Sequence, residues 1–303
     1  MEESTAKLAR SITRSGSSQT YWTARLLVDK ERMDDFFRAY AYFRWADDFI
    51  DAGSPSDNER AMFARRQREL IERLYRNEPV DGLAPEEAIV ADLIRHDSAA
   101  ESNLQSFIYN MLTVIEFDAY RRGQVVSQQK LDWYTDCLAI SVTDGIQYFI
   151  GNDHTYPVVE NRLSAARGAH IAHLLRDMLA DIGDGFINIP REYLEAHAIG
   201  PEEIDSAPYR AWVRQRVQQA RSDFADGIGY LDELDVLRCK IAGYWYCARF
   251  EGVLNTIEHD GYRLRPEYKR HKISTWVGLM VVATSVTLRH FYRKSLRILW
   301  RHK

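Results

Sequence analysis

The sequence predicts an all-α protein, and three observations support that prediction. Only 8 prolines and 16 glycines interrupt 303 residues, which favours long elements over many short strands and turns. Apolar residues recur at helical spacing through most of the chain, and no strand-type alternation rises above background. The composition is 46% apolar and 28% charged, which is typical of a globular chain and excludes a disordered one. We therefore expect one helical domain over residues 1–267, followed by a tail over residues 268–303.

Start and stop signals divide the expected domain into eight helices. Asp29 is a candidate N-cap for the first helix, and Gly53 follows its end. The second stops near Pro79, and Pro85 can open the third. Gly151 breaks the chain after the fifth. The expected helices span residues 31–51, 58–76, 85–96, 103–121, 129–149, 161–182, 208–231 and 235–260.

The cysteines and the N-terminal residues indicate a compartment. Cys137, Cys239 and Cys247 are widely spaced and odd in number. This pattern fits buried thiols in a reducing environment and does not match metal-finger spacing. The first sixteen residues contain no apolar segment of signal-peptide length. We therefore expect a cytoplasmic protein.

The net charge of −4 conceals an uneven distribution. Residues 268–303 contain nine Lys and Arg and no acid, which leaves 31 basic residues against 44 acidic ones in the rest of the chain. An acidic body with a basic tail is not the pattern of a nucleic-acid reader, whose positive charge follows one face of the fold. We expect no nucleic-acid partner.

The most informative local pattern is an aspartate pair near residue 50. Asp47 and Asp51 are four residues apart, so on a helix they lie on one face, and Arg44 shares that face. Carboxylates placed so close together repel each other unless a cation lies between them. A single pair of this kind is most often a solvated acidic helix end.

The pattern recurs, which favours a functional interpretation. Asp177 and Asp181 form a second pair with the same spacing, again beside an arginine, Arg176. Both pairs are embedded in apolar sequence. Oxygen ligands of this kind suit Mg²⁺, which commonly bridges carboxylates to substrate phosphates. Two such faces would hold Mg²⁺ against a diphosphate, with the arginines adding charge-assisted hydrogen bonds.

These motifs resemble the squalene/phytoene synthase family over roughly residues 17–265. The first family motif is present as residues 40–51, preceded by the Ser-rich segment 17–21. The second is present as residues 174–181, followed by Gly185 and the segment 187–192. The resemblance implies the all-α isoprenoid synthase fold, a single helical barrel with a central cavity.

The same resemblance implies an activity. It is that of a Mg²⁺-dependent prenyltransferase that joins two allylic prenyl diphosphates, farnesyl or geranylgeranyl, head to head with loss of diphosphate. A squalene-type reductive ending would need NADPH, and a phytoene-type ending would not. The sequence contains no Gly-rich dinucleotide fingerprint, which leaves the use of NADPH open.

The resemblance also implies three overlapping sets of site residues. The catalytic set is Tyr40, Arg44, Asp47, Asp51, Arg176, Asp177 and Asp181. The substrate-binding set is Ser18, Thr20, Arg44, Arg176, Arg249 and Arg265. The metal-binding set is Asp47, Asp48, Asp51, Asp177, Asp181 and His173.

The sequence departs from the family pattern at several positions. His170 and His173 replace a Gln and a metal-binding Asn, and imidazole is a poorer Mg²⁺ ligand than a carboxamide oxygen. Phe186 stands where the family tends to have Arg. A tyrosine-rich middle segment is reduced to residues 136–138, with Tyr134 nearby. A role for the two histidines in the core, or in positioning a metal ligand, is as well supported as direct ligation.

Other residues have two interpretations. The aromatic residues among positions 42–49 could shield a carbocation, but core packing is more common at this spacing. Residues 244–246 could line a prenyl tunnel or simply pack. Asp118 is equally a site residue or not, and Arg121 and Arg122 are expected to be solvated.

Two alternative functions remain open at this stage. A terpene cyclase or single-substrate prenyl diphosphate lyase on the same fold would explain the departures at His173 and Phe186. A non-catalytic helical subunit is less favoured, because it gains nothing from four uncompensated acids. The sequence does not define the prenyl chain length or the oligomeric state.

The tail predicts a surface for a membrane. Residues 273–288 are apolar but number only 16, fewer than the roughly 20 that a spanning helix needs. On a helical wheel an apolar face then adjoins a basic stripe, which is typical of a helix lying in an anionic headgroup layer. The face is Leu288, Tyr292, Leu296 and Leu299, and the stripe is Arg289, Arg293, Arg297 and Arg301. We expect peripheral attachment to the cytoplasmic face of a membrane; the alternative is a last core helix with a solvated basic end.

Overall fold

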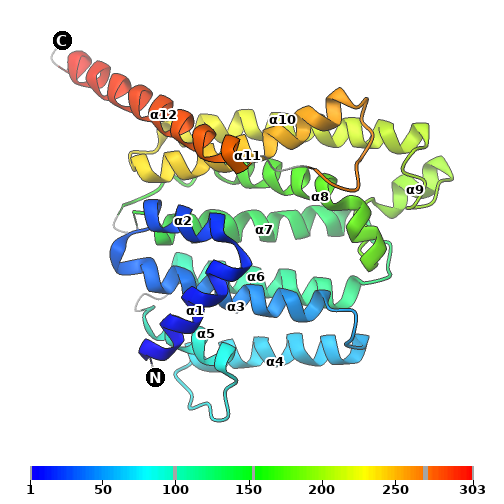
Figure 1. Cartoon of the computed structure of the whole chain (residues 1–303), viewed down its shortest axis with the longest axis horizontal. Helices are drawn as coiled ribbons and strands as arrows, with labels where there is room; N and C mark the ends of the chain where they lie inside the picture. The colour runs from blue at the N-terminus through cyan, green and yellow to red at the C-terminus, as the bar shows by residue number, and fades with distance from the viewer. Residues whose placement is uncertain (1, 98–100, 152–153, 269–271, 302–303) are drawn as a thin grey trace. The chain divides into compact units, whose positions relative to one another are not determined.

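The computed structural model describes residues 2–97, 101–151, 154–268 and 272–301 (Figure 1). Within these ranges twelve α-helices and two short 3-10 helices form, and no strand, so the all-α prediction is confirmed. The chain divides into two compact units, residues 1–152 with 183–187 and residues 153–182 with 188–303. The domain boundary expected at residue 267 stays a prediction.

The first unit is built from α1 to α7. In Figure 1, α6 and α7 run side by side, and α1 and α5 both pack on α3. Several of these helices begin at a serine whose hydroxyl accepts the N–H three residues on, as at Ser56, Ser102 and Ser127. The elements are α1 (Glu2–Gly16), α2 (Ser18–Leu27), η1 (Lys30–Arg32), α3 (Met33–Asp51), α4 (Asp57–Tyr75), α5 (Pro85–Arg95), α6 (Asn103–Arg121) and α7 (Gln128–Phe149).

The predicted N-cap at Asp29 is wrong. The Asp29 side chain makes no capping bond to the helical residues that follow it, and α3 begins only at Met33, after η1. The Asp29 carboxylate instead accepts the backbone N–H of Gly151 at 2.7 Å, and the Asp29 N–H donates to the Phe149 carbonyl at 3.0 Å. The residue therefore fastens the end of α7 to the segment before α3.

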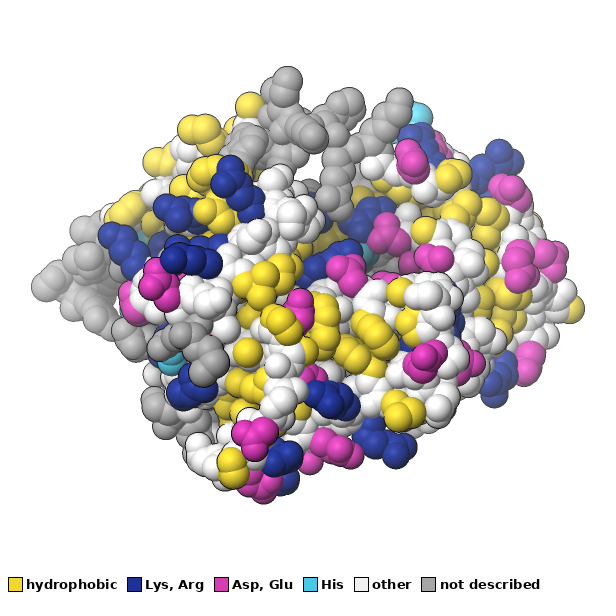
Figure 2. Space-filling model, turned by 60° about the horizontal axis from the view of Figure 1, so that its bottom comes forward, with side chains coloured by type: hydrophobic (Ala, Val, Ile, Leu, Met, Phe, Trp, Pro, Cys, Tyr) yellow, Lys and Arg dark blue, Asp and Glu magenta, His cyan; other side chains and the backbone are white. Residues whose placement is uncertain are grey.

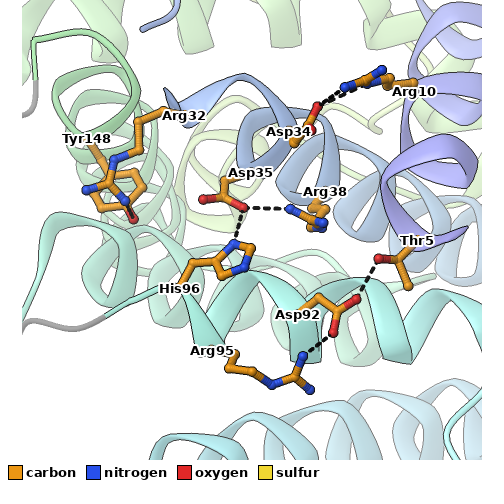
Figure 3. Close-up of polar contacts among 10 residues, drawn as sticks. All are labelled: Thr5, Arg10, Arg32, Asp34, Asp35, Arg38, Asp92, Arg95, His96 and Tyr148. Atoms are coloured by element: carbon orange, nitrogen blue, oxygen red, sulfur yellow. Dashed lines mark hydrogen bonds and ion pairs between the residues drawn. The ribbon is translucent and has the colours of Figure 1, made fainter. Parts of the chain in front are cut away.

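Buried polar contacts join α1, α3 and α5 (Figure 3). The Thr5 hydroxyl on α1 donates to Asp92 on α5 at 2.6 Å. Asp35 on α3 contacts His96 Nδ1 at 2.7 Å and accepts a bond from Arg38 at 2.9 Å. Buried carboxylates persist only when they are paired in this way. The network fixes how α3, which carries the first aspartate pair, packs against its neighbours in the first unit.

The second unit contains the remaining helices, held together by glycines at close contacts. A Cβ on Gly227 of α10 would lie 2.4 Å from the Ala165 backbone nitrogen, and one on Gly168 of α8 would lie 2.9 Å from the Ala220 carbonyl oxygen. Any larger residue would push α8 and α10 apart. The elements are η2 (Glu160–Leu163), α8 (Ser164–Asp184), α9 (Arg191–His197), α10 (Ala207–Glu233), α11 (Leu237–His259) and α12 (Lys272–Arg301).

The last helix, α12, packs on α11 within the second unit. Val286 and His290 are buried, and a Cβ on Gly278 would touch the Trp245 ring at 3.4 Å. Side chains at 272–276, 279, 293–294 and 296–301 lie outside the described residues, and these include Arg293, Leu296, Arg297, Leu299 and Arg301 of the predicted tail pattern. None of the described helices is long and apolar enough to cross a membrane.

Charged side chains of both signs are mixed on the surface. Figure 2 shows acidic and basic side chains interspersed with hydrophobic ones on the face turned toward the reader. Local partners, rather than a broad field of one sign, therefore distinguish one carboxylate from another on that face.

All three cysteines are buried free thiols, as predicted.

Candidate active site

The first aspartate pair lies at the C-terminal end of α3. Burial, together with the nearby carboxylates of Asp51 and Asp118, raises the pKa of Asp47 to about 7 against the smaller lowering effect of Arg44. Burial also raises the pKa of Asp51 to about 6, with Asp118 and Asp184 adding to the rise. The three acids Asp47, Asp51 and Asp118 therefore form one electrostatic group in which negative charge exceeds the available positive charge.

Asp118 brings α6 into this group and has its own partners. Its carboxylate accepts a bond from Arg121 Nε at 2.6 Å and one from the Tyr134 hydroxyl at 3.0 Å. Burial nevertheless raises the pKa of Asp118. Asp118, which the sequence left undecided, is thus coupled to the first motif.

The sequence expectation for Arg121 and Arg122 is wrong, because neither side chain is simply solvated. Arg121 is 5% exposed, and its guanidinium lies 5.0 Å from the Tyr134 ring centroid and 5.1 Å from that of Phe186. Arg122 is half-buried and also lies over Phe186, at 5.6 Å. Phe186, the residue that replaces a family arginine, therefore packs against two arginines supplied by the end of α6.

Arg122 also caps α3 near the aspartate pair. Its Nη1 atom donates to the Ala52 carbonyl at 3.1 Å and approaches the Asp51 carbonyl at 3.4 Å. A cation at the C-terminus of a helix satisfies its last carbonyls and interacts favourably with the helix dipole. The positive charge also lowers the pKa of Asp51 against the opposing effects of burial and nearby acids. A tertiary contact of this kind has no signal in the local sequence.

Arg44 and Tyr40 lie one and two turns before the pair. Arg44 forms an ion pair with Asp48, and both side chains are about half exposed, at 46% and 56%. Tyr40 is hydrogen-bonded to the Ser17 side chain, which links α3 to the Ser-rich segment. Asp48 therefore differs from its neighbour Asp47, since it faces solvent and has a cation as partner.

The Ser-rich segment forms the N-terminus of α2. The Ser17 hydroxyl donates to Thr20 Oγ1 at 2.8 Å and accepts the Thr20 backbone N–H at 3.2 Å. Ser18, the first residue of the helix, is exposed, and Thr20 is partly buried. The hydroxyls and N–H groups at such a helix start are suited to an anionic group.

Aromatic residues beside the first motif pack as core. Tyr42 is fully buried and its hydroxyl donates to Gln67 at 3.0 Å. Phe49 stacks on Phe63 with ring centroids 4.1 Å apart. These contacts favour the packing interpretation of the aromatic run.

The second aspartate pair lies on α8, in the second unit. Asp177 accepts two bonds from Arg176, one from Nε at 2.6 Å, and lies 2.8 Å from His173 Nε2. Burial raises the pKa of Asp177, but the bonds from Arg176 and His173 outweigh it and hold this pKa well below its usual range. The Phe250 ring of α11 lies beside this group, with its centroid 5.9 Å from that of His173. His173, expected among the metal ligands, is engaged with Asp177 in this structure.

Asp181 has a partner that sequence reasoning missed. The buried Asn188 donates from Nδ2 to Asp181 Oδ2 at 2.7 Å. Asn188 belongs to the segment that follows the second motif, where a polar residue between Ile187 and Ile189 was the available signal.

The C-terminal candidates have separate surroundings. Arg249 lies over the Phe250 ring at 5.4 Å and lowers the pKa of Tyr246, which burial raises to about 12. Arg265 is exposed and paired with Asp260. The structure therefore brings Arg249 to the same ring as the second motif and does not bring Arg265 there.

The donor sets differ in how well they suit a hard divalent cation. Asp47 and Asp51 offer carboxylate oxygens whose mutual repulsion an added cation would relieve, so they fit Mg²⁺. Both Asp177 oxygens are hydrogen-bonded, so the second motif fits less well as it stands. Within the described ranges, no three His, Cys, Asp or Glu side chains lie close enough together to hold a metal ion.

The twelve helices of the described residues have the all-α isoprenoid synthase fold. The chain belongs to the squalene/phytoene synthase family, which matches residues 13–277. Its members are prenyltransferases that condense prenyl diphosphates head to head. A search of curated proteins found no significant match.

Solved structures agree on the fold. Squalene synthase HpnC from Alicyclobacillus acidocaldarius is 17% identical, with a TM-score of 0.66 over 86% of this chain and 95% of that one. A dehydrosqualene synthase in complex with ligand is 17% identical, with a TM-score of 0.72 over 94% and 98%. A complex of TcSQS with a ligand is 14% identical, with a TM-score of 0.64 over 95% and 92%. At these identities the likeness establishes the fold.

Proposed function

We propose that the protein is a Mg²⁺-dependent synthase that joins two farnesyl or two geranylgeranyl diphosphates head to head into a squalene- or phytoene-type product. The observation that supports this most directly is the group of Asp47, Asp51 and Asp118, in which burial and mutual repulsion raise the pKa values. Asp47 is half-buried and the Asp118 side chain is only 13% exposed, which distinguishes this group from a fully solvated acidic helix end. Family membership supports the reaction type.

Within this proposal Asp47 and Asp51 hold the metal, with Asp118 nearby, and Asp177 and Asp181 form the second metal-binding face. Bound Mg²⁺ would supply positive charge for the departing diphosphate. Arg176 orients Asp177 through its two bonds, and His173 does so from the other side. Asn188 orients Asp181 in the same way. Such partners fix the direction in which a ligand carboxylate presents its oxygens.

The remaining candidates bind diphosphate in this proposal. The α2 start, with Ser18 and Thr20, offers N–H and hydroxyl donors, and Tyr40 connects this segment to α3 through Ser17. Arg44 and Arg249 add positive charge, as the resemblance implies. The surface pair of Arg265 with Asp260 gives Arg265 the weakest structural support.

A product assay tests the proposal. Purified protein is incubated with Mg²⁺ and farnesyl or geranylgeranyl diphosphate, with and without NADPH, and the products are extracted. We expect a C30 or C40 hydrocarbon or cyclopropylcarbinyl diphosphate that disappears when the metal is chelated. A reductive product formed only with NADPH would assign the squalene-type ending.

Other outcomes would overturn the proposal. A C15 or C20 product would identify a terpene cyclase or a single-substrate lyase. No turnover with either substrate, by a protein that circular dichroism shows to be helical, would identify a non-catalytic subunit. For substitutions of the motif aspartates, Asp132→Asn serves as a matched control, because Asp132 is an exposed aspartate on α7 outside both motifs.

A further inference from the structure

The outer face of α12 carries an unusual concentration of exposed apolar side chains. Of the thirteen large hydrophobic residues exposed in the described part of the chain, six belong to this one helix, with exposed fractions from 58% to 70%. They are Val277, Met280, Val281, Leu288, Phe291 and Tyr292. We call these six residues the α12 apolar face.

These side chains form one stripe, which also contains the exposed Thr284 between Val281 and Leu288. At 100° per residue they fall within about 120° of one another, and they extend over about 22 Å of helix. The buried residues Val286 and His290 lie on the opposite side, where α12 packs on α11. The helix therefore uses one face for the core of the second unit and presents a second apolar face to solvent.

This arrangement joins the two interpretations of the tail. The apolar segment does pack as a last helix, as one of them expected. It also leaves apolar side chains uncovered, among them Leu288 and Tyr292 of the face that the other expected; the Leu296 and Leu299 side chains lie outside the described residues. Exposed apolar residues that are scattered singly are normal in globular proteins, whereas a group of them on one side of a single helix marks a surface that binds a partner.

The charge of the segment indicates which partner fits. Residues 268–303 contain nine Lys and Arg and no acid, although the rest of the chain is acidic. Arg289 is exposed within the described part of α12. An apolar stripe on a basic segment is the composition of helices that lie in the headgroup layer of anionic bilayers. A second copy of this chain would bring two basic segments together, which is unfavourable.

We propose that α12 attaches the protein to the surface of an anionic phospholipid bilayer, on the cytoplasmic side, with the α12 apolar face inserted among the headgroups and the basic residues contacting lipid phosphates. The proposal concerns attachment and is independent of the reaction proposed above. The helix lies along the surface and does not span it, in agreement with its hydropathy.

Sedimentation of the full chain with lipid vesicles tests this proposal without any substrate. We expect binding to vesicles that contain phosphatidylglycerol, weak binding to phosphatidylcholine alone, and loss of binding as salt screens the charges. The double variant Leu288→Glu/Phe291→Glu should bind at least about tenfold more weakly, because it places two acids on the inserted face. Both residues are exposed, so the fold should persist by circular dichroism.

Matched controls separate the face from general surface effects. Met62→Glu/Val158→Glu changes two exposed apolar residues outside α12 and should bind within about twofold of the wild type. A charge variant, Arg289→Gln/Arg293→Gln/Arg297→Gln, should bind anionic vesicles about tenfold more weakly and lose most of the salt dependence.

Three results would overturn the proposal. One is equal vesicle binding by the wild type and the Leu288→Glu/Phe291→Glu variant, and another is no binding by the wild type. The third is a wild-type dimer in light scattering that this variant converts to a monomer, together with no vesicle binding. That result would assign the face to a second copy of the chain.

Discussion

The two aspartate pairs have the same spacing and each has an arginine nearby, yet the carboxylates of Asp47 and Asp177 are in opposite electrostatic states. On α3, burial and three nearby acids together raise the pKa of Asp47 to about 7. On α8, burial acts in the same direction, but Arg176 and His173 hold the pKa of Asp177 well below its usual range. The arginine of the first motif pairs with Asp48 instead.

The difference shows that the chemistry of an aspartate motif depends on which atoms its neighbours bond. In the first motif the repulsion is left for an external cation to relieve, which favours strong dependence on a metal. In the second, Arg176 and His173 already bond to one carboxylate, which favours orientation of that group over tight metal binding. The predictions below test this contrast.

The largest effect is expected at Asp47. Asp47→Asn should lower turnover by about a hundredfold or more, because it removes the negative charge that would hold the metal at a site where charge stabilisation is worth several kcal/mol. Asp48→Asn should cost less than about tenfold, since the exposed Asp48 side chain has Arg44 as its partner. The measurement is kcat at saturating Mg²⁺, with circular dichroism as the check on folding.

The contrast between neighbouring aspartates would fail if both variants lost activity to the same degree. It would also fail if Asp47→Asn kept near-normal activity, because the uncompensated group would then have no part in catalysis.

Glu87 shows that burial alone does not determine the pKa of a carboxylate. Its side chain is only 2% exposed, yet it accepts bonds from Arg66 at 2.7 and 2.8 Å, from Gln67 at 3.0 Å and from the Ala84 N–H at 2.9 Å. The bonds from Arg66 lower the pKa of Glu87 to about 2 against the effect of burial. Glu87→Gln should therefore reduce the free energy of unfolding at neutral pH by about 2 kcal/mol.

The pH dependence of this loss has a definite sign. A carboxyl whose folded pKa lies below its unfolded value stabilises the fold above the unfolded pKa and loses that contribution as pH falls. The gap between wild type and Glu87→Gln should thus be complete above about pH 5 and shrink as pH falls from 4.5 toward about 2. Urea denaturation at several pH values measures it. A gap that stays constant over this range would show that hydrogen bonding, independent of charge, accounts for the loss.

Arg122→Gln should have a smaller effect on stability. The change removes the positively charged cap of α3, whose bonds to the Ala52 and Asp51 carbonyls are worth about 1 kcal/mol. Denaturant unfolding measures the loss, with Arg65→Gln as a matched control because Arg65 is an exposed arginine on α4. An equal loss in both variants would indicate that the cap contributes nothing specific.

The smallest effect is expected at His173. If His173 occupies a metal-ligand position, His173→Asn should keep activity within about threefold of the wild type or raise it. The Mg²⁺ concentration that gives half-maximal rate should also fall. His259→Asn is a control, because His259 is 88% exposed. Unfolding, or loss of activity at every Mg²⁺ concentration, would assign His173 a structural or direct catalytic role.

The fold was largely predictable because helix signals are local. Pro85 opens α5 as expected, and the eight expected helices all have counterparts. Helices α1, α2 and α9 were missed, and the buried face of α1 is made of small residues, such as Ala6 and Ala9, whose apolar signal is weak. The N-cap predicted at Asp29 was wrong because of a tertiary contact: the Asp29 carboxylate accepts the backbone N–H of Gly151 instead.

The site was predictable only in part. Spacing along a helix is fixed by sequence, so both aspartate pairs could be placed on helix faces in advance. Their partners are not fixed in this way. Arg121 is buried because Asp118, Tyr134 and Phe186 converge on it from distant positions, and a dibasic pair read alone looks solvated.

The interleaving of the two units has a consequence for the order of synthesis. The first unit ends at Asn152 apart from residues 183–187, where Gly185, at φ +89°, accepts the Gly123 N–H at 2.7 Å. Those residues, including the Phe186 that packs on Arg121, leave the ribosome 35 residues later. At about 5–20 residues per second this delay is about 2–7 s. For that time α1 to α7 have been synthesised, but Arg121, the buried arginine at the end of α6, still lacks its contact with the Phe186 ring.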